Sequence, residues 1–402
     1  MTRSKQALII GAGIAGPVLA LFLKRIGIEA RIFEASAGPS EAGGGLGIAP
    51  NGMHVLTAAG IVERVKAASV EAHESVFENQ HGKLLACVPA GDAARYGQPS
   101  VAIARPMLQC VLIEEVAAQG IEVVYGKRLV GIKDLMGGPV VARFEDGTTA
   151  EGDFVVGADG IRSQVRQAVF PEAPKPVYTG LMAPGGFSPC RENCSCSPGS
   201  RQQMHFIFGA DGFFGHVNVV TPAGPQTLWW STASAPLPSK EEMAAITQAD
   251  LKRRLLKLHG NWAPPVPRLI ETAVEILNIA IHDVPSLPRW SAGRVVLMGD
   301  AAHAVAPHSG QGASMALEDA MVLVKMLRDS NSDDVKEVFG CFERERRPRT
   351  DRVIALGRRN GQRKERISAI QYWFQQQMMR IFIPLFLSAR RQDWLWGYQI
   401  EW

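Results

Sequence analysis

The chain has 402 residues, of which 46% are hydrophobic and 20% are charged, the balance of an ordinary globular protein. At roughly 150 residues per domain, this length predicts two or three structural units with a large buried core. The formal net charge of +4 is too small to indicate nucleic acid as the main partner.

Neither a secretory leader nor a membrane span is expected. The first apolar run, Ala7 to Ile10, is too short for a signal core, so the chain is expected to be cytoplasmic with reduced thiols. The longest late apolar run, Ile381 to Leu387, contains Pro384 and falls far short of the roughly 20 residues of a spanning helix.

A cysteine cluster in the middle of the chain has the spacing of metal ligands at first sight. Cys190, Cys194 and Cys196 lack a nearby fourth ligand and lie in a stretch rich in Pro, Gly and Ser. We therefore expect a loop here and no metal site.

The chain opens with a βαβ pattern: a strand is predicted over 7–10, a helix over about 14–25 and a second strand over 29–33. Glycines then form a loop over 43–47, and 52–66 looks helical. The next predicted elements are irregular strands over 74–99, a helix over 107–119, and strands over 121–125, 129–134, 140–144 and 153–156.

The turn between the first strand and helix is Gly11-Ala-Gly-Ile-Ala-Gly16. Gly11 permits a tight turn, Gly13 lets the backbone approach a pyrophosphate, and Gly16 allows close packing of helix on strand. Glu34 ends the second strand, where an acidic side chain can bind a ribose hydroxyl. Because an acidic residue disfavours a 2′-phosphate, the pattern predicts a site for FAD or NAD rather than NADP.

Two further glycine-rich motifs follow later in the chain. The first runs from Gly157 to Ser163 and continues to Arg166, and the second runs from Gly299-Asp300 through Pro307 to the sequence Glu318-Asp319-Ala320. In the second, a strand end delivers an aspartate and a glycine-rich turn opens a helix, which again favours close approach to a phosphate or a ring.

Between these motifs, about 177–283, the composition changes. Alternating segments such as 205–208 and 215–220 predict antiparallel strands, and Phe, Trp and Met are frequent. A strand over 294–298 and a helix-rich remainder follow. This order predicts a discontinuous nucleotide-binding domain interrupted by a β-rich domain.

With all three motifs in this order, the chain resembles the class A (single-component) flavin monooxygenases, the para-hydroxybenzoate hydroxylase and salicylate hydroxylase-like superfamily. Arg105 and the run from Phe342 to Arg349 also resemble that family. The resemblance implies an α/β fold: a Rossmann-like, glutathione-reductase-type FAD-binding domain, an inserted antiparallel β-sheet substrate domain, and C-terminal helices. The implied segments are 1–73, 100–176 and 284–364 for the FAD-binding domain, 74–99 and 177–283 for the substrate domain, and 365–402 for a helical tail and possible pocket lid.

The resemblance also assigns cofactor residues. FAD would be held by the first motif and its strand partner, by the arginine and the loops that border the ring, and by the second and third motifs: Gly11, Gly13, Ile14, Ala15, Gly16, Glu34, Ala35, Gly45, Gly47, Arg105, Asp159, Gly160, Asp300, Pro307, Gly310, Gln311, Gly312, Ala313 and Ser314. Asp159 would also serve the transient NADPH or NADH. The family usually has Asn where Ser314 stands, which makes the positioning of the ring less certain.

The implied reaction takes hydride from NADPH or NADH and inserts one oxygen atom of O2 through a C4a-hydroperoxyflavin into an aromatic, polycyclic or prenylated small molecule. The family places Pro307 beside the ring. A positioned base would help a phenolic substrate, and His205, His216 and Tyr178 are candidates, each equally readable as an ordinary strand residue. Aromatic residues on the expected substrate sheet favour a planar apolar ligand: Phe206, Phe208, Phe214 and Trp230.

Several alternatives stay open. A flavin enzyme that never inserts oxygen, such as a reductase or a halogenase, is the second hypothesis, and a flavin-binding scaffold is the third. The oligomer is expected to be a monomer or a homodimer. His303 is expected to be structural. The basic run 344–366 is expected to be a solvated helix surface, with attraction of the NAD(P)H phosphates as the alternative, and Trp394-Leu-Trp396 to be a packed tail.

Overall fold

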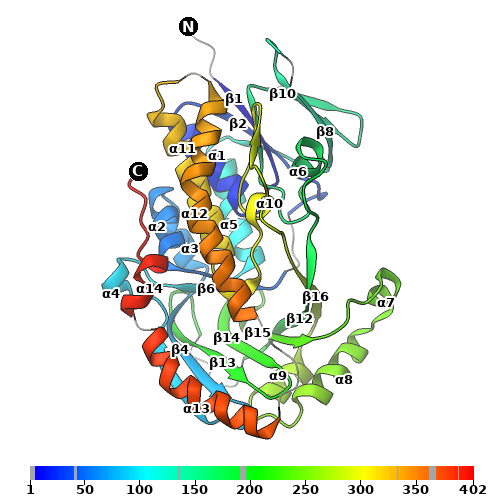
Figure 1. Cartoon of the computed structure of the whole chain (residues 1–402), viewed down its shortest axis with the longest axis vertical. Helices are drawn as coiled ribbons and strands as arrows, with labels where there is room; N and C mark the ends of the chain where they lie inside the picture. The colour runs from blue at the N-terminus through cyan, green and yellow to red at the C-terminus, as the bar shows by residue number, and fades with distance from the viewer. Residues whose placement is uncertain are drawn as a thin grey trace.

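A six-stranded sheet forms one end of the computed structural model, which describes residues 5–39, 43–134, 136–190, 196–332, 334–361, 368–387 and 389–402 (Figure 1). Its strand order is β17-β18-β11-β1-β2-β7, and every pair is parallel except β17 with β18. The strands are β1 (Gln6–Ile10), β2 (Glu29–Phe33), β7 (Glu122–Val124), β11 (Phe154–Gly157), β17 (Ser291–Ala292) and β18 (Val295–Leu297).

Helices cover this sheet because its strands are apolar on both faces. All residues of α1 from Ala15 to Leu23 are buried, and α1 packs against both α5 and α11. An antiparallel meander and α6 adjoin the sheet near β11. These elements are α1 (Ala15–Arg25), α5 (Arg105–Ala118), α6 (Gln164–Val169), α11 (Gly312–Asp329), β8 (Leu129–Asp134), β9 (Val140–Phe144) and β10 (Thr149–Gly152).

A nine-stranded sheet forms the other half of the molecule. Its pairs are antiparallel, as predicted, except β4 with β13, which run parallel. The sheet also recruits β3 and β6, so it extends beyond the predicted segments 74–99 and 177–283. In spatial order the strands are β16 (Ile276–Asp283), β12 (Val177–Pro189), β15 (Gly224–Ser234), β14 (Phe213–Thr221), β13 (Arg201–Phe208), β4 (Val70–Asn79), β6 (Val101–Ala104) and β3 (Gly45–Ile48), with β5 (Leu84–Pro89) beside β4.

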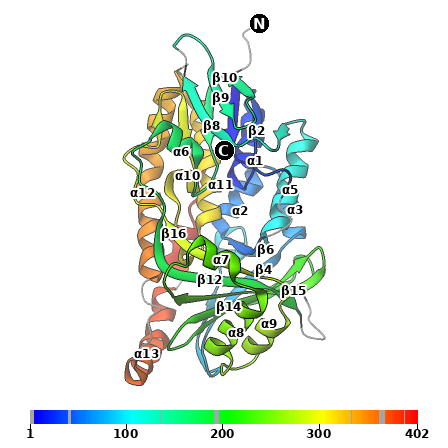
Figure 2. The ribbon, with the colours of Figure 1, turned by 90° about the vertical axis from the view of Figure 1, so that its right-hand side faces the viewer.

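The two faces of the nine-stranded sheet meet different partners. Leu181 and Ala183 pack with Ala306, which lies in the six-stranded half, so we call their side the inner face. Phe214 and Trp229 pack on helices α8 and α9, and we call that side the outer face. Figure 2 shows these helices below the sheet, with the six-stranded half above it.

The helices on the outer face were not predicted from the composition of 177–283. Leu251 and Leu255 of α8 are buried against the sheet, one helical turn apart. A capping box between Thr247 and Asp250 begins this helix and is a signal visible in the sequence. The three helices are α7 (Lys240–Ala245), α8 (Gln248–His259) and α9 (Val266–Thr272).

The predicted helix over 52–66 is two helices, because the chain reverses at Gly60, whose φ is +83°. The 27-residue helix α12 runs alongside the six-stranded half toward the nine-stranded sheet, and α13 continues beyond the end of α12 (Figures 1 and 2). No helix in the described part of the chain is long and apolar enough to cross a membrane. The remaining helices are α2 (Pro50–Ala58), α3 (Val62–Ala67), α4 (Ala93–Tyr96), α10 (Asp300–His303), η1 (Pro307–Ser309), α12 (Val335–Gly361), α13 (Ala369–Phe386) and α14 (Ala389–Trp396).

Candidate active site

The first glycine turn has the geometry that its sequence predicts. Gly11 adopts φ +112°, and a Cβ atom there would lie 2.4 Å from the Ala158 carbonyl oxygen. A Cβ at Gly16 would lie 2.0 Å from the Gly11 carbonyl oxygen. A Cβ at Gly13 would meet nothing within 4 Å. The first and last glycines are therefore required by protein packing, whereas Gly13 faces open space.

Helix α1 begins at this open space without a side-chain cap, since Ile14 at the N-cap accepts no hydrogen bond from the first turn. Uncapped N–H groups and the positive end of the helix dipole suit a pyrophosphate. Glu34 stands at the end of β2, and its two carboxylate oxygens accept hydrogen bonds from the backbone N–H groups of Ala12 at 2.8 Å and Ser36 at 2.9 Å. The carboxylate is thus fixed beside the turn, while Ala35 is exposed next to it.

The second motif is held by hydrogen bonds inside the protein. The Asp159 carboxylate accepts from Ser163 Oγ at 2.5 Å and from the N–H groups of Gln164 and Val165 at the start of α6. Burial raises the pKa of Asp159, and these hydrogen bonds oppose the rise. Arg166 is fully buried and donates to the Ala301 carbonyl oxygen at 2.8 Å, so it ties α6 to the third motif. Contact of Asp159 or Gly160 with a cofactor stays a prediction.

Asp300 lies at the start of α10, directly after the Gly299 turn, and its side chain is accessible. Surrounding protein raises the pKa of Asp300, while the charges of His303 and Arg105 lower it. Arg105 and Asp300 are 195 positions apart in the sequence, yet the charge of Arg105 acts on the Asp300 carboxylate. This is expected if both side chains line one site. Arg105 begins α5, and its N–H donates to the Gly44 carbonyl oxygen at 2.9 Å.

The loop over 307–313 presents some of its predicted cofactor residues and hides others. Pro307 and Gly310 are exposed, and Gly312 and Ala313 are partly exposed. The side chain of Gln311 instead accepts a hydrogen bond from Asn51 Nδ2 at 3.0 Å.

Ser314 lies buried between two helices. It has no exposed surface, and its Oγ accepts a hydrogen bond from the Ala49 N–H at 3.1 Å. A Cβ at Gly52 would lie 2.6 Å from that Oγ, so α2 and α11 are in close contact here. The Ser314 hydroxyl thus joins α11 to α2, and its contact with a cofactor stays a prediction.

A buried charge network lies behind this loop. Asp319 accepts hydrogen bonds from Gly299 N–H at 2.8 Å, from His303 Nε2 at 2.5 Å and from Arg346 Nε at 2.7 Å. Burial would raise the pKa of Asp319, but the charges of His303 and Arg346 outweigh it and bring the pKa to about 2. This pairing agrees with a structural role for His303.

Glu318 extends the network to Asn51 and to Arg349. Its Oε1 accepts hydrogen bonds from Asn51 Nδ2 and from the Arg349 guanidinium, both at 2.7 Å. The prediction of a solvated surface for the basic run is wrong for Arg346, which is fully buried, and for Arg349, which is nearly so. The sequence analysis did not predict this network. The adjacent acids Glu318 and Asp319, and the arginines Arg346 and Arg349 three residues apart on one helix face, were a signal visible in the sequence.

The predicted substrate residues divide between the two faces of the sheet. The rings of Phe206 and Trp230 lie 6.1 Å apart on the inner face, and Phe206 and Phe208 also contact Phe77. Phe214 is fully buried on the outer face, where its ring stacks on Trp229 at 5.4 Å. Successive side chains of a strand alternate between faces, so Phe214 belongs to the core under α8 and α9, and its contact with a substrate stays a prediction.

The proposed bases also lie away from the inner face. His205 and His216 are cross-strand partners whose rings stack at 4.5 Å, and they alternate with Phe206 and Gly215. His205 Nδ1 lies 2.9 Å from Glu78 Oε2. The alternation turns both rings to the outer face, and their role as catalytic bases stays a prediction. The Tyr178 hydroxyl donates a hydrogen bond to the Ala235 carbonyl oxygen at 2.7 Å. Its proton is therefore engaged by the backbone, as for an ordinary strand residue.

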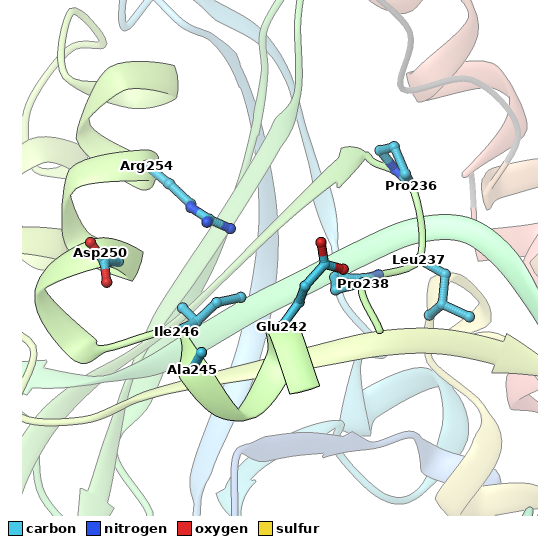
Figure 3. A pocket seen from close by; sticks show the side chains of 8 residues that line it. All are labelled: Pro236, Leu237, Pro238, Glu242, Ala245, Ile246, Asp250 and Arg254. Carbon is cyan, nitrogen blue, oxygen red and sulfur yellow. The ribbon is translucent and has the colours of Figure 1, made fainter. Parts of the chain in front are cut away.

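A small surface pocket of about 430 Å³ lies outside this arrangement (Figure 3). It is lined only by residues between Pro236 and Arg254, where a loop faces α7 and α8. None of the motif residues borders it, so it is separate from the candidate site. Among the described residues no group of His, Cys, Asp or Glu is arranged to hold a metal ion; Cys194 lies outside them.

The site fits an FAD molecule on its own geometry. An uncapped helix start faces open space at Gly13, Glu34 is anchored where a ribose would lie, and Asp300 and Arg105 are accessible and close enough to interact. Gly45 lies on the far side, where a Cβ would be 2.1 Å from Leu228, and Gly47 on the same strand is exposed. The residues present thus suit an extended dinucleotide that passes between the two sheets.

Comparison with known proteins gives a consistent picture. A family model described as FAD binding domain matches residues 4–356. The chain is 33% identical over 395 residues to aurachin C monooxygenase/isomerase of Stigmatella aurantiaca, covering 97% of each, and 30% identical over 378 residues to 6-hydroxynicotinate 3-monooxygenase of Pseudomonas fluorescens, covering 90% of this chain and 92% of that one. The crystal structure of Klebsiella pneumoniae HpxO with FAD and uric acid superposes with a TM-score of 0.84 at 25% identity, covering 98% and 97%.

Proposed function

Since the chain belongs to the class A flavin monooxygenase family and is an FAD-dependent NAD(P)H monooxygenase, we propose that it hydroxylates or epoxidises a neutral, planar aromatic or polycyclic molecule. The proposed position of that molecule is the inner face of the nine-stranded sheet, beside Trp230. Related proteins support an aromatic ring as substrate, since their names include 6-hydroxynicotinate and salicylate.

The observation that carries this proposal is the approach of two cofactor loops to one sheet face. Ala306, directly before Pro307, packs with Leu181 and Ala183 of the inner face. From the other side, Gly45 of β3 lies against Leu228, which precedes Trp230 by two residues and therefore shares its face. A ring bound between these loops would look onto this part of the sheet.

The chemistry of the inner face favours an uncharged substrate. The side chains that define it are Leu181, Ala183, Leu228 and Trp230, and Phe187 joins the same cluster. None of them offers a cation to a carboxylate, whereas an aromatic ring gains from offset or edge contacts with Trp230. We therefore propose a neutral phenol or enol ring rather than an aromatic acid.

The roles proposed for the protein follow from the geometry. Bound FAD supplies hydride acceptance and oxygen activation. The start of α1 would hold its phosphates, Glu34 its ribose, and the backbone of 310–313 would border its ring, where N–H groups can stabilise negative charge. The apolar inner face would exclude water from the reacting ring. Asp159 and Gly160 remain candidates for contact with NAD(P)H.

The experiment that tests this function adds substrates one at a time to FAD-loaded protein. Neutral phenols and polycyclic enols are matched with the carboxylates of the same rings. NADPH and NADH consumption, peroxide release and incorporation of ¹⁸O from labelled O2 are measured. We expect neutral rings to stimulate oxidation with little peroxide and with label in the product. Preference for the carboxylates would overturn the neutral-substrate proposal, and reduction without label would indicate an oxidoreductase that inserts no oxygen.

A matched pair of variants tests the placement of the substrate. Trp230→Leu should raise the KM for an active substrate roughly tenfold, because an aromatic contact and apolar area are lost, with little effect on FAD binding. Val274→Ala, at an exposed position in the turn that follows α9, should leave KM unchanged. Equal KM values for Trp230→Leu and the unmodified enzyme would place the substrate elsewhere.

We also propose the cytoplasm as the compartment, because an NAD(P)H-dependent monooxygenase needs a supply of reduced nucleotide. A monomer or a homodimer remains the prediction for the oligomer, and size-exclusion chromatography with light scattering distinguishes them.

A further inference from the structure

Helix α13 carries apolar side chains on two opposite sides. One side packs on the β4–β5–β13 end of the inner face, where Met379 and Ile383 join Phe206 and Phe208 in one cluster. Tyr372 fixes the start of this contact by donating its hydroxyl to the Phe208 carbonyl oxygen at 2.9 Å. The helix is thus docked on the protein by one side, and its position does not depend on the other.

The opposite side is an apolar stripe open to solvent, which we call the outer stripe. Its members repeat with spacings of three and four residues, with neighbouring positions in between, so they form one broad face along the whole helix. They are Ile370 (71% exposed), Trp373 (56%), Phe374 (58%), Met378 (50%), Ile381 (58%), Phe382 (36%), Leu385 (55%) and Phe386 (52%). An 18-residue helix is roughly 27 Å long. Exposed apolar patches of such extent mark interaction surfaces.

The charges around the outer stripe are positive. No Asp or Glu occurs between Ser368 and Leu387. Arg380 lies within the helix, and Arg390 and Arg391 follow at its C-terminal end, exposed. The Arg391 guanidinium lies 4.6 Å from the Phe386 ring, at the edge of the stripe. The next acid after the helix, Asp393, is already engaged by Arg95 at 2.6 Å, and Glu365, which precedes the helix, lies outside the described residues.

This charge pattern separates two kinds of partner. A second copy docked through the same stripe would bring two sets of arginines together with no acidic residue on the helix to receive them, because a two-fold interface is self-complementary. An anionic phospholipid surface accepts both features: the apolar and aromatic side chains enter the headgroup boundary, and the arginines meet the phosphates. Exposed Trp and Phe side chains are also those that prefer this boundary.

We propose that α13 binds the surface of an anionic phospholipid bilayer through the outer stripe, lying in the plane of the membrane without crossing it. The inner face of the substrate sheet then lies directly behind the helix. This inference is independent of the substrate proposed above, since it rests only on the exposed side chains of α13. Figure 2 shows this helix at the lower end of the molecule, beyond the end of α12.

The experiment is flotation of the FAD-loaded protein with vesicles of phosphatidylcholine alone or mixed with phosphatidylglycerol. We expect binding to the mixed vesicles, weaker binding to the neutral ones, and partial release by salt. Replacing Phe382 and Phe386 together by Ser should weaken binding more than tenfold, roughly the effect of two lost apolar anchors. The control Val274→Ser alters one of the most exposed apolar residues elsewhere and should bind as the unmodified protein does.

A second variant tests the charge without altering the apolar stripe. Arg390→Gln with Arg391→Gln should weaken binding to the mixed vesicles by roughly fivefold per arginine and leave binding to neutral vesicles nearly unchanged. Bound FAD absorbance checks that each variant is folded. Absence of flotation with either vesicle would overturn the proposal. A dimer in lipid-free solution that Phe382→Ser and Phe386→Ser dissociate would overturn it in favour of a second copy.

Discussion

Gly11 and Gly13 stand two residues apart and are constrained by different things. Gly11 is required by the protein, because it has a positive φ and because a Cβ there would lie 2.4 Å from the Ala158 carbonyl oxygen. Gly13 is free of protein contacts on its Cβ side. What limits Gly13 is therefore the molecule that the turn holds.

This difference gives a prediction. Gly13→Ala should leave the thermal unfolding of the apoprotein unchanged and weaken FAD binding at least tenfold, about 1.4 kcal/mol, since the added methyl group meets only the phosphates. Gly11→Ala, the matched variant, should itself destabilise the apoprotein by about 1–3 kcal/mol. Fluorescence titration with FAD and thermal unfolding of both apoproteins provide the test. A large loss of stability in Gly13→Ala would show that the turn is limited by packing at both glycines.

At single residues, the sequence predicts best where backbone geometry decides. The positions of Gly11 and Glu34 follow from one local βαβ pattern. The face on which a strand residue lies depends on long-range pairing, and for that reason the sequence alone did not separate Phe214 from Phe206 and Phe208. Alternation alone places Phe206 and Phe208 on one face, but only the register of β13 with β14 shows that Phe214 is on the other.

Among the elements, α12 is joined to α11 by buried charges rather than by an apolar seam alone. Arg346→Met should destabilise the protein by about 3–5 kcal/mol, because the carboxylates of Glu318 and Asp319 would lose a buried counter-charge. Arg344→Met, two residues away on the exposed side of the helix, should change stability by less than about 0.5 kcal/mol. Urea unfolding of both variants measures the difference, and similar values for the two would mean that the buried pairs contribute little.

The same network reaches the C-terminal segment. Arg349 donates to the carbonyl oxygens of Trp394 and Leu395 at 2.8 and 2.9 Å, and Leu395 is buried, which confirms the packed tail. Arg349→Ala should therefore loosen α14 and lower the temperature of local unfolding. Limited proteolysis after α13 is the measurement, and cleavage no faster than in the unmodified protein would contradict the expected anchoring role.

Elements differ in how far the sequence reveals them. The strands over 29–33, 129–134 and 140–144 have the predicted bounds, because their apolar pattern and flanking turns are local. Helices α7 to α9 were missed, because composition was averaged over a segment in which strands dominate. The capping box at Thr247 would have identified α8 from the sequence.

At the scale of the whole molecule, one buried histidine makes stability depend on pH. His259 lies under the nine-stranded sheet between Phe214 and Trp262, and its Nε2 is 2.7 Å from Ser231 Oγ. Burial lowers the pKa of His259 from the ordinary value of 6.5 to about 3. Between these two pKa values the unfolded chain binds a proton at His259 that the folded protein does not bind. This contribution to the free energy of unfolding is therefore fully present above pH 6.5 and is lost as the pH falls toward 3.

The corresponding variant is His259→Gln. Between pH of about 7.5 and about 5.5 the unmodified protein should lose about 1.4 kcal/mol more stability than this variant, since one proton uptake on unfolding is removed. The exposed His81→Gln serves as control and should keep the pH dependence of the unmodified protein. Urea unfolding at both pH values measures it, and parallel behaviour of all three proteins would exclude His259 as the source.

The strand order of the six-stranded sheet has a consequence for how the protein folds. β1 pairs with β11 across almost 150 residues, and β11 with β18 across about 140 more, while strands β12 to β16 of the nine-stranded sheet lie between those last two partners. Such non-local pairing loses the conformational entropy of large loops before the stabilising contacts form, so folding is expected to be slow. The glycine turn cannot acquire its final surroundings until residue 297 has joined the sheet. FAD captured by an early intermediate would have only the first βαβ unit to hold it, and the cofactor should enter late, as the last event that locks an assembled scaffold.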